Sequence, residues 1–80
     1  MFFSNLCPVC KQENLKFLKE ISSQKIYLVC NECLSEWASA DESLDSEKST
    51  LNSYGPSEEA TLEELKNLGW DKYVKNPPHA

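Results

Sequence analysis

Two Cys-x-x-Cys pairs constrain this chain more than any other feature of its sequence. Cys7 and Cys10 form the first pair, Cys30 and Cys33 form the second, and nineteen residues separate the two. Each Cys-x-x-Cys turn can present two sulfurs to one ion, and this spacing is expected of a tetrahedral four-cysteine zinc site. We therefore expect Cys7, Cys10, Cys30 and Cys33 to bind one Zn²⁺ ion.

Two other uses of the cysteines fit the sequence less well. A redox site would be a single exposed Cys-x-x-Cys at the start of a helix, usually inside a βαβ unit, and the sequence has two pairs and no sign of that unit. A disulfide framework needs an oxidising compartment. The N-terminal "MFFSNLCPVC" has no basic segment and no small-residue cleavage site, so it does not have the form of a signal peptide. We expect a cytoplasmic protein with reduced thiols.

The expected zinc site is structural rather than catalytic. Four thiolates fill the coordination shell of zinc and leave no position for a water molecule. A chain of 80 residues has a small core, so the ion would supply stability that the core lacks. His79 is the only histidine and has no candidate catalytic partner beside it. We expect no catalytic residues, and hence no enzyme.

Between the cysteine pairs the sequence predicts a β-hairpin. The runs at 15–21 and 25–30 contain β-formers, and the polar residues between them suit a turn. Leu15, Phe17 and Ile21 share one face of the first strand at a period of two. A hairpin of this length would bring the two cysteine pairs together.

The second half of the chain predicts a loop followed by a helix. A third short strand around 36–40, with Trp37 turned inward, leads into a serine-rich stretch that offers little apolar surface to bury. Further on, Thr61 and Glu64 fit a capping box, and Gly69 suits the residue that closes a last helical turn. The apolar residues of this helix at helical spacing are Leu62, Leu65 and Leu68.

The run "CPVC…LVCNEC…W", which ends at Trp37, resembles a zinc ribbon over roughly residues 5–41. The resemblance implies two zinc knuckles presented by a three-stranded antiparallel sheet. The expected fold is therefore a small zinc-stabilised α+β domain. It consists of a ribbon over 1–41, an acidic serine-rich loop over 42–57 and a helical C-terminal extension over 58–76 that packs on the ribbon. The expected core comprises Phe17, Ile26, Leu28, Trp37, Leu62, Leu65, Leu68, Trp70 and Tyr73.

The charge of the chain argues against nucleic acid as its main partner. The net charge is −5 and the sequence contains no arginine, whereas phosphate backbones are bound largely by lysine and arginine. Residues 41–64 hold eight acids and one lysine. This balance favours a basic protein as partner. The candidate partner-binding residues are Asp41, Glu42, Asp45, Glu47, Glu58, Glu59, Glu63 and Trp70.

Two functions fit these features. The acidic composition, the small size and the tail "ATLEELKNLGWDKYV" resemble those of small immunity proteins and antitoxin-like inhibitors of bacterial toxins. That resemblance implies a protein-binding module that neutralises a basic toxin or nuclease. The alternative is a transcription- or translation-associated zinc ribbon that binds nucleic acid, polymerase or ribosome. This second function would need a basic face, built from Lys11, Lys16, Lys19 and Lys25.

Overall fold

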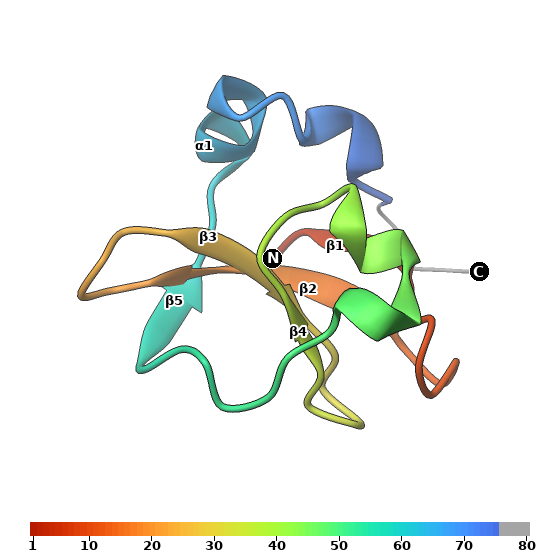
Figure 1. The fold of residues 1–80 in the computed structure, drawn as a ribbon. Helices are drawn as coiled ribbons and strands as arrows, with labels where there is room; N and C mark the ends of the chain where they lie inside the picture. The colour runs from red at the N-terminus through yellow and green to blue at the C-terminus, as the bar shows by residue number, and fades with distance from the viewer. Residues whose placement is uncertain (76–80) are drawn as a thin grey trace.

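An antiparallel sheet of five strands forms the centre of the computed structural model, which describes residues 1–75 (Figure 1). The order along the sheet is β1-β2-β3-β4, and β5 pairs with the second half of β2 on the edge that β1 also uses. His79 and the end of the expected helical extension lie outside the described residues. The strands are β1 (Phe3–Leu6), β2 (Asn14–Glu20), β3 (Ile26–Val29), β4 (Glu36–Trp37) and β5 (Ser57–Glu59).

The predicted hairpin is confirmed, but the sheet is larger than the three strands expected. β2 and β3 pair antiparallel with Phe17 opposite Leu28, and β3 pairs with the short β4. The sequence did not predict β1 or β5. β5 reads Ser-Glu-Glu, which lacks the β-branched and aromatic residues that mark a strand. β5 forms because β1 pairs only with the first half of β2. The same edge of β2 is open from Leu18 onwards, and β5 pairs with it there.

One face of the sheet carries the core. Leu15, Phe17, Leu28 and Trp37 have no exposed surface and pack under Leu65 of the helix α1 (Leu62–Asn67). Trp70 and Tyr73 are partly buried against this cluster, as is Ile26. The buried set also includes residues that the sequence did not single out for the core, namely Cys7, Cys30, Ala40 and Ala60.

Two leucines expected in the core, and an isoleucine expected to share a strand face with Leu15 and Phe17, are exposed instead. Ile21 is 50% exposed because β2 ends at Glu20 and the chain then turns, so the alternation of the strand no longer applies. Leu62 and Leu68 are 37% and 48% exposed. α1 has only six residues, and of the three leucines expected in the core, Leu62, Leu65 and Leu68, only Leu65 is fully buried.

The opposite face of the sheet is covered by residues 49–57, which Figure 1 shows in green to teal as they run towards β5. The ring of Tyr54 stacks on that of Tyr27 at 3.9 Å and 5°. A carboxylate oxygen of Glu36, itself buried, accepts a hydrogen bond of 2.9 Å from the backbone amide of Ser53. The stretch expected as an open loop is therefore attached to the sheet.

α1 begins and ends as the sequence predicts. The Thr61 hydroxyl accepts a hydrogen bond from the amide of Glu64, and the Glu64 carboxylate accepts one from the amide of Thr61. Gly69 has a φ of 75°, the left-handed conformation in which glycine is unstrained. A 3₁₀ turn, Asp71–Tyr73, follows.

Candidate metal centre

The four cysteines lie in two equivalent turns at one end of the sheet. Cys7 and Cys10 connect β1 to β2, and Cys30 and Cys33 connect β3 to β4. In each turn the amide that follows the second cysteine donates to the carbonyl of the first, from Lys11 to Cys7 at 3.0 Å and from Leu34 to Cys30 at 2.9 Å. The repeated geometry aims both pairs of sulfurs at the same point.

The spacing of the sulfurs matches a tetrahedron around one ion. Cys7 Sγ lies 3.7 Å from Cys33 Sγ, and Cys10 Sγ lies 3.5 Å from Cys30 Sγ. All four sulfurs lie within 4.8 Å of one another. Two sulfurs that each lie about 2.3 Å from a tetrahedral ion are about 3.8 Å apart. The cysteines are thus positioned to bind one metal ion, as the sequence predicted.

The environment of the sulfurs divides them into two kinds. Cys7 and Cys30 are fully buried, and burial raises the pKa of both thiols, that of Cys30 to about 12. Burial also acts to raise the pKa of Cys33, but hydrogen bonds from the hydroxyl and backbone of Ser35, together with those from Cys30 and Cys7, outweigh it and the pKa falls to about 6. Because a metal binds the thiolate, loading the site would release protons from the buried pair.

Ser35 is a neighbour of the cluster that the sequence gave no reason to single out. Its side chain is buried and its Oγ lies 3.3 Å from Cys33 Sγ. Its carbonyl accepts a hydrogen bond from the amide of Cys30, which fixes the second turn. A serine two residues after a cysteine is too common in sequences to signal a role, and only the fold brings the hydroxyl to the sulfur.

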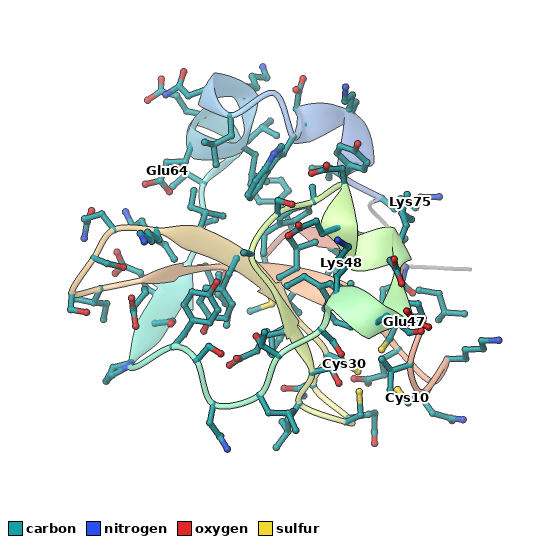
Figure 2. The ribbon with its side chains drawn as sticks, viewed as in Figure 1. Cys10, Cys30, Glu47, Lys48, Glu64 and Lys75 are labelled. Carbon is teal, nitrogen blue, oxygen red and sulfur yellow. The ribbon has the colours of Figure 1, made fainter. Side chains whose placement is uncertain are left out.

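The candidate acids fall into two groups on opposite sides of the molecule. Figure 2 shows Glu47 on the side of Cys10 and Cys30, and Glu64 on the far side. In the first group Asp41, Asp45 and Glu47 are exposed and Glu42 is half-buried. Glu42 and Glu47 lie in two 3₁₀ turns, Glu42–Leu44 and Ser46–Lys48, and Asp41 and Asp45 directly precede these turns. In the second group Glu58, Glu59 and Glu63 are exposed on β5 and α1.

The two groups differ in how much of their charge is already paired. Glu58 lies 3.4 Å from Lys19 Nζ, and Glu59 lies 3.0 Å from the N-terminal amine. No ion pair joins Asp41, Asp45 or Glu47 to any other described residue. The acids near the cysteines therefore present the more open negative surface.

The first acidic group is attached to the sheet at two points. The indole Nε1 of Trp37 donates to the carbonyl of Asp45 at 2.9 Å, and Asn5 and Ser43 exchange hydrogen bonds of 3.1 and 3.2 Å. Trp70, the remaining candidate, lies elsewhere. Its ring is 6.5 Å from that of Phe17 and is partly buried against the core.

No model of a known family, no curated protein and no solved structure matches this chain. Fold and site together define a small antiparallel-sheet protein with a cluster of four cysteines that can hold one metal ion. Within residues 1–75 no helix is long and apolar enough to cross a membrane.

Proposed function

We propose that the protein binds one structural zinc ion through its four cysteines and acts in the cytoplasm as a non-enzymatic, zinc-ribbon-type protein-binding module. The observation that carries the metal assignment is that the four sulfurs are spaced as the corners of one tetrahedron, and that two of the cysteines are buried in the core. Zinc favours four-coordinate tetrahedral sites of this ligand type. A site closed by four sulfurs supports a structural role.

The distances between the sulfurs favour a metal over disulfides. A disulfide requires sulfurs about 2.05 Å apart, whereas the two pairs that join one turn to the other are 3.5 and 3.7 Å apart. All four residues are free cysteines in the structure. A shared ion explains why two turns from different parts of the chain converge.

Native mass spectrometry of the protein purified under reducing conditions tests the metal assignment. We expect one zinc per chain, and loss of the ion on treatment with a chelator. Apparent zinc-binding energies of comparable peptides are on the order of 10–16 kcal/mol, so removal should unfold the sheet. Trp37 is buried beside the cysteines, and its fluorescence would report this unfolding. A metal-free protein that keeps its native fluorescence and circular dichroism would refute the structural role.

For the partner, we propose a basic protein that the acidic group near the cysteines recognises, as an inhibitor or immunity-type protein would. Four thiolates around one Zn²⁺ would add about −2 to the charge at this end. Asp41, Asp45 and Glu47 are exposed, and their segment is held by Trp37 and Asn5, so little ordering would be needed on binding. Charges arranged in this way accelerate association with a partner of opposite sign.

The test is capture of the partner from the native host with wild-type protein and with the triple variant Asp41→Lys, Asp45→Lys, Glu47→Lys. We expect a basic protein that is retained by wild type at low salt, released as salt rises, and lost with the variant. A matched control is Glu59→Lys, Glu63→Lys, Asp71→Lys, which changes the net charge equally at exposed positions outside the cysteine turns and the first acidic group. Equal loss with both variants would show that only total charge matters and would refute this site.

The ion pairs of Lys19 argue against the alternative function, binding of nucleic acid. Of the four lysines that such a face would use, Lys19 lies between Glu58 and Glu64 and is ion-paired with both. Lys16 donates to the side chain of Asn31. In a titration at low salt we expect no binding of DNA or RNA at micromolar protein.

A further inference from the structure

A groove of about 880 Å³ lies on the molecule away from the cysteines. The tip of the β2–β3 hairpin and Ile26 line one part of it, Leu68 and Trp70 after α1 line another, and Ser53 and Tyr54 line a third. Neither the zinc site nor the acidic group near the cysteines contributes to it.

The groove exists because β4 is too short to cover its neighbour. β4 pairs with β3 only at Leu28 and Val29, and the chain turns away after Trp37. β3 begins two residues earlier, at Ile26. The position beside Ile26, where a longer β4 would have continued, is therefore not filled by a strand, and Ala38 lines the groove there.

The backbone of Ile26 points into this position. Backbone groups in an antiparallel ladder alternate between the two edges of a strand. The amide of Glu20 donates to the carbonyl of Lys25, so Lys25 faces β2 and the next residue, Ile26, faces the other way. Among residues 1–75 no partner is found for the amide or carbonyl of Ile26 on that edge. An open donor and acceptor of this kind are satisfied by another extended backbone.

Two aromatic side chains form the walls, and both are held in place. Trp70 packs on Phe17, with ring centroids 6.5 Å apart. Tyr54 stacks on Tyr27, whose hydroxyl lies 2.7 Å from the hydroxyl of Ser57. Because these rings are already positioned, a ligand would not have to order them.

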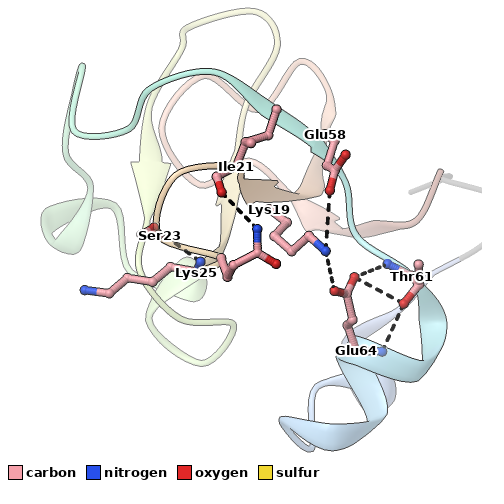
Figure 3. A network of polar contacts seen from close by, with 8 residues as sticks. Lys19, Ile21, Ser23, Lys25, Glu58, Thr61 and Glu64 are labelled. Carbon is pink, nitrogen blue, oxygen red and sulfur yellow. Dashed lines mark hydrogen bonds and ion pairs between the residues drawn. The ribbon is translucent and has the colours of Figure 1, made fainter.

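Charge indicates which kind of chain could enter. The charged residues lining the groove are Glu20, Glu64 and Lys25, and because Glu64 is ion-paired with Lys19 the lining is nearly neutral on a molecule with a net charge of −5. The Glu64 carboxylate also bonds Lys19 and Thr61, as Figure 3 shows, so its place on the groove wall is fixed. A second copy of this acidic chain would meet repulsion of like charges, whereas a basic segment would not.

We propose that this groove binds an extended, basic segment of a partner protein, which pairs antiparallel to β3 beside Ile26 and continues the line of β4. The residue opposite Ile26 faces Trp70 and Leu68, since paired residues share a face of the sheet, and its neighbours face Tyr54. The inference rests on the proposed protein-binding role, but it places the contact on a surface separate from Asp41, Asp45 and Glu47.

The experiment selects ligands for the zinc-supplemented full chain from a phage-displayed library of random nine-residue linear peptides. The peptides selected are then titrated into ¹⁵N-labelled protein. We expect sequences with alternating apolar residues and lysine or arginine. On binding, the amide of Ile26 should shift downfield and become protected from solvent exchange.

Two variants test the geometry. Ile26→Pro removes the outward amide at a position where a strand tolerates proline, and it also replaces the Ile26 side chain that packs against the core. Leu68→Asp changes an exposed wall residue without touching the buried core. Each should weaken binding of the selected peptides at least ten-fold, whereas Leu51→Asp, at another exposed leucine that lies outside the groove, should not.

The outcomes separate this inference from the proposed function. The triple variant Asp41→Lys, Asp45→Lys, Glu47→Lys should bind the selected peptides with an affinity within two-fold of wild type. If no peptide is selected, if Ile26 stays unprotected with bound peptide, or if Leu68→Asp binds like Leu51→Asp, the groove proposal is overturned. The acidic surface near the cysteines would then still be tested by partner capture alone.

Discussion

Lys19 Nζ lies 2.6 Å from a carboxylate oxygen of Glu64, and this ion pair joins the middle of the sheet to the first turn of α1 (Figure 3). Lys19 occupies the inward face of β2, on the same side as Phe17. The strand therefore keeps its alternation at Lys19, because the buried side of the strand can hold this amine where it pairs with Glu64, 45 residues further along the chain.

We predict that this pair makes stability depend on pH in a defined way. The hydrogen bond from Lys19 lowers the pKa of Glu64 below its ordinary 4.5, and the same bond raises the pKa of Lys19 above 10.5. The contribution of Glu64 is present above pH 4.5 and is lost as pH falls through its lowered pKa. The contribution of Lys19 is present below pH 10.5 and is lost as pH rises through its raised pKa. The pair therefore stabilises the fold throughout the window between these values.

Urea unfolding of wild type and Glu64→Gln checks this prediction, because glutamine keeps the capping box and removes only the charge. The variant should have a lower midpoint at pH 7, and the gap between the two proteins should narrow below pH 4.5. Because loss of zinc in acid would unfold both proteins, the comparison is confined to pH values at which both still bind one zinc. Glu63→Gln, on the same helical turn, should match wild type. A gap that stays constant from pH 7 to the lowest of these pH values below 4.5 would contradict the assignment.

Sequence reasoning located the elements that depend on local signals. The Cys-x-x-Cys spacing, the apolar alternation at Leu15 and Phe17, and the capping box at Thr61 each act within a few residues, so they can be found from the sequence alone. β5 and the attachment of residues 49–57 depend on what the rest of the fold leaves open. A strand reading Ser-Glu-Glu carries no local signal for pairing with the edge of β2.

The same distinction holds for the candidate sites. The four metal-binding positions follow from residue type and spacing, whereas the eight candidate partner residues were grouped by sequence proximity and the fold separates them. The groove could not be predicted at all, because it arises from a strand that stops after two residues and from rings contributed by distant segments.

Leu65 should carry the attachment of α1 to the sheet. It is fully buried, while Leu62 on the same helix is 37% exposed. Leu65→Ala should lower the free energy of unfolding by about 2–5 kcal/mol, and Leu62→Ala by less than about 1 kcal/mol. Chemical denaturation of both zinc-loaded variants measures the difference. Equal losses would mean that α1 does not pack as described.

Leu34 should be replaceable by glycine with a gain in stability. It has a φ of 65° immediately after Cys33, and its side chain is 61% exposed. The left-handed conformation costs a non-glycine residue about 1–2 kcal/mol, and the added freedom of an unfolded glycine offsets about 0.5–1 kcal/mol of that. Leu34→Gly should therefore stabilise the fold by about 0.5–1 kcal/mol. Val9→Gly, within the first turn but at a residue without positive φ, should destabilise it, and thermal melts of the two variants compare them directly.

Ser35 should tune the metal affinity without being a ligand. With Cys33 as a thiolate, the buried Ser35 hydroxyl is placed to donate to its sulfur across 3.3 Å, and this partner lowers the pKa of Cys33. Neighbours that hydrogen-bond a ligand typically affect metal affinity about 10–100-fold. Ser35→Ala should therefore weaken zinc binding about ten-fold in competition with a chromophoric chelator, while the zinc-saturated protein keeps its native circular dichroism. Ser22→Ala, at an exposed turn far along the hairpin from the cysteines, should bind zinc as wild type does. If Ser35→Ala also binds with wild-type affinity, the hydroxyl has no role in the site.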